Sequence, residues 1–330
     1  MQKKTFILLS NDRLHLPFIF NPSGKLNGKL PFPWKSSTFT VNNNKIINTP
    51  TEGSNLILDG NMELAGVANW ANSATPTTKL KNTVSPLYDT QDLHLITDAA
   101  DFEGAQQTAV ATNTWYAFGG SYRVVSGSGY LIFGTGLGNI FSAINVSQST
   151  KTDSRVAHLN LPTANITAYL WGLSPTEIYY DNIFISPLFS LRCFVTSPTQ
   201  NIIVKIPVTL FNSQAATFGS NPAGVSLNWD SLEQNGVDCY ITNFNGNTRI
   251  NLVKWLNGSP TSVLDQIITY GAGNFVEVRK SGTTYQVFYN SIQIGTNQTI
   301  SDAAIISNKR MGIFNVGGGS TQGAFTLSAN

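Results

Sequence analysis

Short apolar segments in which every second residue is polar follow one another along the chain. The clearest series is Phe275–Lys280, Thr284–Tyr289 and Ile292–Gly295, joined by segments of three and two residues. A period of two places alternate side chains on opposite faces of a strand, and connections of this length are typical of hairpins. The pattern therefore predicts a three-stranded antiparallel meander late in the chain.

The same pattern predicts strands in the middle of the chain. It is found at 116–125, 130–133, 168–172 and 178–185, with a glycine-containing turn at 127–129 between the first two. No stretch keeps an apolar helical face over three turns, so helices contribute little to the predicted fold.

The length of the chain and the spacing of its strands indicate two domains. A chain of 330 residues has room for two domains of about 100–200 residues each. Many short strands at intervals of about 8–12 residues are typical of a sandwich or a barrel. Pro187 closes the strand at 178–185, and the pattern resumes after it. We predict an all-β fold of two tandem antiparallel β-sandwiches, at 51–188 and 189–330.

Residues 1–50 differ from the rest of the chain. They contain five prolines, and proline blocks helices and central strands alike. The apolar groups Phe6–Leu9 and Leu16–Phe20 should pack on the body of the protein, on a neighbouring subunit or on a larger assembly. The segments Thr38–Val41 and Lys45–Ile47 are typical of a small hairpin. We expect residues 1–50 to form an extended N-terminal arm that serves assembly.

Composition supports the β class and excludes two kinds of partner. Charged residues make up 12% of the chain, about half of the usual ~25%, and Asn, Thr, Ser, Gly and Gln replace them. These residues suit turns and exposed strand faces but form helices poorly. The net charge is +2 without a basic block, so no nucleic-acid surface is expected. No apolar run reaches ~18 residues, so we expect no membrane insertion.

The N-terminus imitates a signal peptide. The apolar stretch within Met1–Ser10 is interrupted by Asn11, Asp12 and Arg13, and no cleavage site with small residues follows it. We therefore expect synthesis in the cytoplasm without a cleaved signal peptide. The two cysteines, Cys193 and Cys239, lie in strand contexts outside any metal-ligand spacing, and we expect buried, inert thiols.

Two segments of the first predicted domain resemble the carbohydrate-binding modules of the family 4/9 jelly-roll type. The entry is Asn55–Glu63, followed seven residues later by Trp70, and the exit is Tyr179–Ile185. The central stretch Thr114–Arg123 resembles a strand of the same family, although its spacing differs. The resemblance implies a jelly roll with a glycan-binding role.

The resemblance also implies a structural calcium ion where the entry and exit strands meet. The matching carboxylates are Glu63 and Asp181. Asn182 is an amide where the family often has a second acid. The alternative is an Asp181 carboxylate that accepts hydrogen bonds and locks the strand ends without metal.

The second predicted domain resembles concanavalin-type, laminin-G-like sandwiches. The residues that carry this likeness are Val276–Gly282, Tyr289–Gly295, Gly312–Asn315 and Ala324–Leu327. The pattern is common to members without catalytic activity.

The sequence lacks the residues that glycoside hydrolysis needs. That reaction uses two carboxylates about 5–9.5 Å apart, and sandwich glucanases carry theirs in a Glu-x-Asp-x-x-Glu run that is absent here. Glu277 stands alone on its strand and faces Arg279, which indicates a solvated ion pair. The three histidines are scattered and have no nucleophile motif nearby. We therefore expect no catalytic residues and no enzyme activity.

Aromatic side chains are the candidates for sugar binding, because the C–H face of a pyranose is apolar. We expect Trp70 and Trp115 in the core from the resemblance. Tyr130, Trp171 and Tyr88 are the better candidates for an open face of the first domain. The complete candidate set is Tyr88, Tyr130, Trp171, Tyr180, Trp229 and Trp255.

The arrangement of the two modules behind Ile47–Gly53 is similar to that in phage virion proteins. The resemblance implies a non-enzymatic structural protein of the virion surface, as a capsid decoration or a tail or fibre appendage, made in the host cytoplasm. Its expected partners are other virion proteins, further copies of itself, with a trimer favoured, and a cell-surface polysaccharide. The alternatives are an extracellular glycan-binding module of a polysaccharide-degrading system and, less favoured, a glycoside hydrolase.

Overall fold

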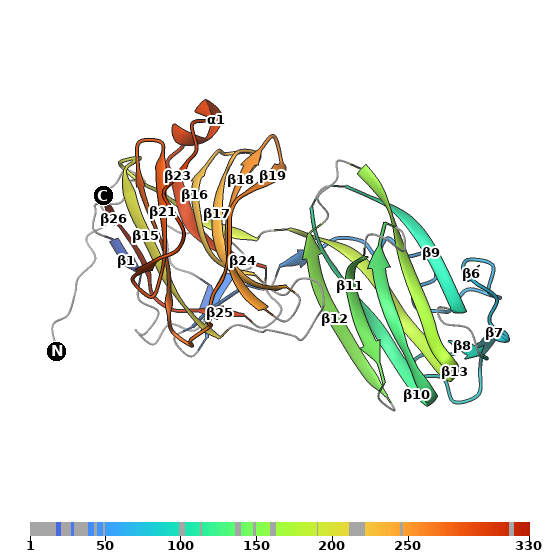
Figure 1. Ribbon diagram of the computed structural model, residues 1–330. Helices are drawn as coiled ribbons and strands as arrows, with labels where there is room; N and C mark the ends of the chain where they lie inside the picture. Colours follow the sequence, from blue (N-terminus) through green and yellow to red (C-terminus); the bar gives the residue numbers. More distant parts are fainter. Residues whose placement is uncertain are drawn as a thin grey trace.

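The computed structural model confirms an all-β protein with antiparallel sheets, arranged as two lobes side by side (Figure 1). It describes residues 18–20, 28–29, 39–42, 45–48, 50–98, 103–112, 114–135, 140–147, 150–158, 163–189, 191–210, 222–244, 247–316 and 320–330. The helix in this part of the chain is α1 (Ala303–Ile306). No helix among the described residues has the length and apolar character needed to cross a membrane.

A nine-stranded sheet builds the first sandwich, in the order β11-β10-β13-β8-β7 with the other strands at its sides. Its strands are β5 (Thr51–Glu52), β6 (Ala71–Ser73), β7 (Thr78–Asn82), β8 (Asp92–Thr97), β9 (Glu103–Thr112), β10 (Trp115–Gly134), β11 (Ile140–Val146), β12 (Lys151–His158) and β13 (Thr163–Phe189).

Two long strands, β10 and β13, give this sheet its two layers. The ring centroids of Phe118 and Phe133, both on β10, lie 4.2 Å apart. Fifteen residues of straight strand would span roughly 50 Å, so β10 must bend back on itself. The pairing of β10 with β13 shifts register at Gly119/Ser121 and again between Val124 and Ser128. Such irregularities bend a strand, so they mark where β10 turns back. The two halves of each strand then enclose one core.

The predicted entry and exit segments of the first domain meet at the edge of this core. The Asn55 side chain donates to Ile183 O at 2.9 Å and accepts from Ile185 N at 3.0 Å. Ile183 N donates to Gly60 O at 2.7 Å. A Cβ on Gly60 would lie 2.0 Å from Ile183 O, so the close approach of the two backbones requires glycine. Trp70 is fully buried in the core beside them, as expected.

The second sandwich packs a six-stranded sheet, β14-β24-β16-β17-β18-β19, against an eleven-stranded one. The strands from residue 191 onward are β14 (Arg192–Thr196), β15 (Ile202–Leu210), β16 (Ala223–Trp229), β17 (Gly236–Phe244), β18 (Asn247–Leu256), β19 (Ser259–Ile267), β20 (Phe275–Ser281), β21 (Thr284–Tyr289), β22 (Ile292–Gln293), β23 (Gln298–Thr299), β24 (Arg310–Asn315), β25 (Thr321–Gln322) and β26 (Phe325–Ala329).

The predicted meander is confirmed in β20, β21 and β22, which pair in that order. One detail of its chemistry was wrong. Glu277 does pair with Arg279, at 2.6 Å, but its side chain is buried and also contacts Lys205. The carboxylate is therefore part of the packed sheet and is not solvated. Cys193 and Cys239 are buried thiols, as predicted.

The described residues of the N-terminal segment join the second sandwich. They form β1 (Phe18–Phe20), β2 (Gly28–Lys29), β3 (Phe39–Asn42) and β4 (Lys45–Asn48). Strand β1 pairs with β26, and the β3–β4 hairpin pairs with β25. The chain thus contributes strands to the second sandwich before it builds the first. Phe6–Leu9 and the remaining arm residues lie outside the described residues.

An aromatic cluster joins the two sandwiches. Trp115 of β10 lies with its ring centroid 6.4 Å from that of Tyr240 and 6.0 Å from that of Phe314, both in the second sandwich. Leu188 and Leu191, at the crossing between the sandwiches, complete the cluster. Trp115 was expected in the core of the first domain, and it instead packs between the two domains.

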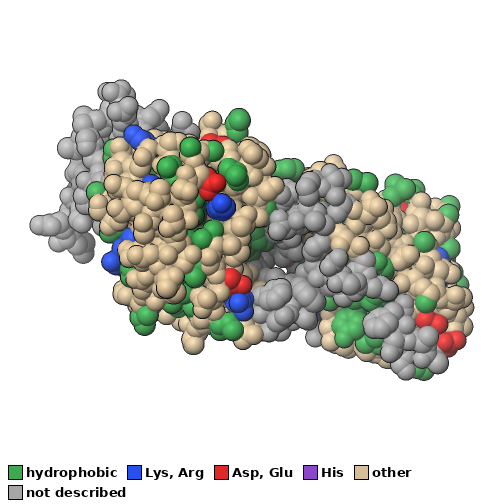
Figure 2. Space-filling view, turned by 45° about the horizontal axis from the view of Figure 1, so that its top comes forward, with side chains coloured by type: hydrophobic (Ala, Val, Ile, Leu, Met, Phe, Trp, Pro, Cys, Tyr) green, Lys and Arg blue, Asp and Glu red, His purple; other side chains and the backbone are tan. Residues whose placement is uncertain are grey.

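Charged side chains are sparse on the surface. The face in Figure 2 carries scattered Lys, Arg, Asp and Glu side chains on a largely uncharged background. This distribution agrees with the low charged fraction of the sequence.

Candidate binding cleft between the two sandwiches

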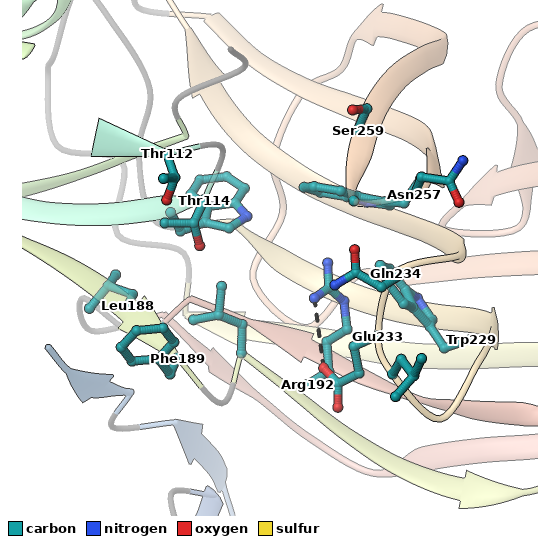
Figure 3. A pocket seen from close by; sticks show the side chains of 15 residues that line it. Thr112, Thr114, Leu188, Phe189, Arg192, Trp229, Glu233, Gln234, Asn257 and Ser259 are labelled. Atoms are coloured by element: carbon teal, nitrogen blue, oxygen red, sulfur yellow. Dashed lines mark ion pairs between the residues drawn. The ribbon is translucent and has the colours of Figure 1, made fainter. Parts of the chain in front are cut away.

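A cleft of about 500 Å³ opens beside the aromatic cluster that joins the sandwiches. In Figure 3, Thr112, Thr114, Leu188 and Phe189 line one side of it, and Arg192, Gln234, Asn257 and Ser259 face them from the second sandwich. The lining residues are Thr112, Thr114, Trp115, Leu188, Phe189, Leu191, Arg192, Trp229, Leu232, Glu233, Gln234, Trp255, Asn257, Gly258 and Ser259. Apolar side chains and side chains that can form hydrogen bonds thus line the same cavity.

Two linked turns hold the polar side of the cleft in place. Asp230 caps the first turn, because its carboxylate accepts from Gln234 N at 2.9 Å and from the Asn235 side chain at 2.6 Å. Gly258 N donates to Gln234 O, and Asn257 N donates to Asn235 Oδ1. These bonds tie the β16–β17 turn to the β18–β19 turn, so the side chains on them start from a fixed backbone.

Two non-glycine residues of these turns have left-handed backbone conformations. Glu233 has φ +55° and Asn257 has φ +52°, and both line the cleft. A non-glycine residue in this region is uncommon, and asparagine tolerates it better than glutamate does. Asn257 and Gly258, with φ +52° and +75°, form the two-residue turn between β18 and β19, where left-handed residues are common. Glu233 is therefore the unusual residue of the two.

Arg192 forms the charged floor of the cleft. Its guanidinium donates to the Asp238 carboxylate through Nη2 at 2.6 Å and through Nε at 3.2 Å. The same group lies 3.8 Å from the ring centroid of Trp229 and 5.2 Å from that of Trp255. The arginine is therefore neutralised by a buried acid and held between aromatic rings.

Trp229 and Trp255, two of the aromatic residues expected to bind sugar, lie in the lining of the cleft. Their ring centroids lie 6.0 Å apart. Trp229 is only 1% exposed, with Arg192 over its ring and Gly236 against it, and its indole donates to Val237 O. Trp255 is 6% exposed. The two rings thus shape the floor of the cleft, and little of their surface is left for stacking on a sugar.

The first-domain candidates do not gather at one site. Tyr88 is exposed, and its hydroxyl lies 3.1 Å from Thr152 Oγ1. Tyr130 is partly buried and packs against a small cluster that includes Trp171. Trp171 is buried, and its indole donates to Ser73 Oγ at 2.7 Å. The expected open face at Trp171 is thus absent.

Tyr180 lies in the core of the first sandwich. It is fully buried, and its hydroxyl donates to Trp171 O at 3.1 Å. The register on β13 explains this, because Ile178 points to the same core and alternate residues share a face. Tyr180 therefore has no surface for a ligand.

The two carboxylates expected to hold calcium bind one loop from two sides. Glu63 accepts from Thr90 N at 3.0 Å, from Gln91 N at 3.1 Å and from the Thr90 hydroxyl. Asp181 accepts from Tyr88 N at 3.1 Å and from its neighbour Asn182 N. The residues around each carboxylate are hydrogen-bond donors, whereas calcium requires six to eight oxygens at one point.

The electrostatic states of these two carboxylates differ. The hydrogen bond from the Thr90 hydroxyl lowers the pKa of Glu63 below its usual range. Burial raises the pKa of Asp181 to about 7, and the nearby Asp92 carboxylate adds to the shift. In the part of the chain that the structure describes, no group of three or more His, Cys, Asp or Glu side chains is placed to hold a metal. Calcium binding at Glu63 and Asp181 stays a prediction.

Sequence reasoning did not identify Arg192, Glu233, Gln234 and Asn257 as cleft residues. A signal was present in the Asn-Gly pair at 257–258, which follows Trp255 and marks a tight turn. No local signal connects that turn with Arg192, because strands distant in sequence bring them together.

No protein-family model matches the chain, and no curated protein matches it. Among solved structures, the chain is similar to the carbohydrate-binding module CBM66 from Bacillus subtilis, with 12% identity and a TM-score of 0.33, over 44% of this chain and 86% of that one. It is also similar to the tandem CBM22-1–CBM22-2 domains of Xyn10C from Paenibacillus barcinonensis, with 10% identity and a TM-score of 0.35, over 85% of this chain and 99% of that one. At these scores the likenesses leave the function of the chain open.

Proposed function

We propose that this protein is a non-enzymatic glycan-binding protein and that its binding site is the cleft between the two sandwiches. The observation that carries the proposal is the lining of that cleft, where apolar side chains, uncharged hydrogen-bonding groups and the ion-paired Arg192 and Glu233 surround about 500 Å³. Ligand sites combine an apolar surface with a few placed polar groups in this way.

The lining suits the two chemical faces of a sugar. Phe189 and Leu232 are 50% and 77% exposed at the cleft and offer apolar surface for C–H groups. Gln234, Asn257 and Thr114 offer amide and hydroxyl groups that donate and accept hydrogen bonds. The rigid turns beneath Gln234 and Asn257 reduce the entropy lost on binding.

The test is binding of a panel of oligosaccharides to the full chain, measured by calorimetry. Gln234→Ala and Phe189→Ala should each weaken binding by about five- to tenfold, which corresponds to roughly 1–1.4 kcal/mol. Asn257→Gly removes the amide and keeps the left-handed backbone, because glycine adopts φ +52° readily. It should weaken binding without unfolding the turn.

The matched control for Asn257→Gly is Asn290→Gly. Asn290 has φ +49° and is exposed in the β21–β22 turn, outside the cleft lining. Its variant should bind as the wild type does. Equal loss in both variants, or unchanged binding in all the cleft variants, would place the glycan elsewhere on the protein.

A finer proposal concerns where the protein acts. The arrangement of the two modules behind Ile47–Gly53, which is similar to that in phage virion proteins, supports a role as a virion-surface appendage that forms a trimer and contacts a cell-surface polysaccharide. Mass spectrometry of purified virions and light scattering of the isolated protein test this role. A monomer absent from virions would favour the rival proposal, an extracellular module of a polysaccharide-degrading system.

A further inference from the structure

The cleft is lined by two charged side chains, Arg192 and Glu233, and Figure 3 shows the ion pair between them. Their charges are compensated to different degrees. Arg192 is 9% exposed and donates three hydrogen bonds to Asp238, whose carboxylate is fully buried. Its positive charge is therefore cancelled within the protein and is not available to attract an anion.

Glu233 is the charged group that the cleft presents to solvent. Its side chain is 39% exposed, and its nearest cationic partners are Arg310 at 3.4 Å and Arg192 at 4.0 Å. Arg310 compensates part of this charge from outside the cleft lining, and Arg192 is already paired with Asp238. Within the lining, Glu233 is therefore the exposed acid that a bound carboxylate would approach.

The backbone holds Glu233 in this position. Its φ of +55° turns the chain at the centre of the β16–β17 turn, and the Asp230 N–Asn235 O bond closes that turn at 2.9 Å. Glutamate at a left-handed position costs stability that a glycine or asparagine would not. The turn therefore fixes the backbone from which the Glu233 side chain enters the cleft lining.

We propose that Glu233 is a specificity-determining residue that makes the cleft select uncharged glycans and reject glycans that carry carboxylates. The proposal rests on the proposed glycan-binding function and deepens it. Gln234, Asn257, Ser259 and the threonines of the first sandwich provide neutral hydrogen-bonding groups, and Glu233 repels a second carboxylate. Specificity of this kind arises from a repulsive element together with attractive contacts.

The size of the effect follows from Coulomb's law. Two like charges about 4 Å apart in a water-like environment change an equilibrium constant by about fivefold. The Debye length falls from about 30 Å at 0.01 M salt to about 3 Å at 1 M, so the discrimination should shrink as salt is added. A steric preference would not depend on salt.

The experiment uses three forms of one oligosaccharide that binds the full chain: the neutral sugar, the same sugar oxidised to a carboxylate at C6, and the methyl ester of that acid. Affinities are measured by calorimetry at low and high salt for the wild type and Glu233→Gln. Asp265→Asn is the matched control, since Asp265 is a partly exposed, ion-paired acid of the second sandwich outside the cleft lining.

The wild type and Asp265→Asn should bind the methyl ester about fivefold more tightly than the acid at low salt, and high salt should reduce this preference. Glu233→Gln should bind both forms alike. Equal wild-type affinity for acid and ester, or a preference unchanged in Glu233→Gln, overturns the role of Glu233 and leaves the glycan-binding function intact. If no oligosaccharide of a broad panel binds, the proposed function fails, and this proposal fails with it.

Discussion

Lys81 should hold the entry turn of the first sandwich, and its removal should destabilise that sandwich strongly. The Lys81 ammonium lies 2.7 Å from Asp59 Oδ2 and also donates to Met62 O. The two side chains are 6% and 0% exposed. Asp59 and Met62 both have φ +59°, so the turn that precedes Glu63 is strained and depends on these contacts.

The expected magnitude follows from what Lys81→Met leaves behind. Methionine keeps most of the apolar stem, but the Asp59 carboxylate remains buried without its cation. Breaking a buried pair on one side costs about 3–5 kcal/mol. For a sandwich of this size, that corresponds to a fall in Tm of about 10–17 °C. The double variant Lys81→Met/Asp59→Asn removes both charges, and asparagine accepts the left-handed backbone, so it should recover a large part of the loss.

The assay is thermal unfolding of the full chain by calorimetry. Hydrogen exchange of peptides that cover residues 55–64 identifies the transition that belongs to the first sandwich. The control is Lys254→Met, because the Lys254–Asp302 pair is 3.1 Å long and its side chains are 29% and 25% exposed. Such a pair contributes about 0–1 kcal/mol.

Two results would refute this reasoning. A loss below about 1 kcal/mol in Lys81→Met would mean that the ion pair does not hold the turn. A double variant less stable than Lys81→Met would mean that the Asp59 carboxylate stabilises the turn even when the Lys81 cation is absent.

Three further predictions concern other parts of the fold. Because the pKa of Asp181 is raised from 3.8 to about 7, the protonated carboxyl stabilises the fold below about pH 4, and this contribution is lost as the pH rises to 7. Asp181→Asn leaves Tyr88 N with an acceptor and should remove the resulting slope of Tm between pH 4 and 8. An unchanged slope would exclude Asp181 as its origin. Calcium should raise the Tm of the wild type and not that of Asp181→Asn or Glu63→Gln; if it stabilises none of them, these carboxylates act only as anchors of their loop. Gly236→Ala would bring a Cβ to 2.3 Å from the Trp229 ring. It should therefore destabilise the second sandwich by about 1–3 kcal/mol and weaken glycan binding. A variant that melts and binds like the wild type would show that the ring moves freely.

Several features of this protein could be predicted from sequence because they depend on neighbours along the chain. The alternation in Phe275–Tyr289 determined two strands and the turn between them, and the structure pairs them in that register. Cys193 and Cys239 were predicted to be buried from their strand contexts, and both are buried. The link between Asn55 and Ile183–Ile185 was predicted from a motif at each end of one domain.

The tertiary structure alone decided which faces remain open. A period of two separates the two faces of a strand but does not say what covers each face. Tyr180 and Trp171 are covered because β10 and β13 fold over one core, which no local pattern encodes. Trp115 is covered by the second sandwich, whose Tyr240 and Phe314 lie more than a hundred residues away.

The candidate site shows the same division. The sequence offered Trp229 and Trp255 as aromatic candidates, but the cleft exists only where the turns of the second sandwich meet the first sandwich. The compensation of Arg192 by Asp238 and the exposure of Glu233 depend on side chains from three strands or turns. The alternation of apolar and polar residues therefore determined the class of fold. Long-range packing decided which charges are cancelled and which can reach a ligand, because burial and distance set the strength of each electrostatic interaction.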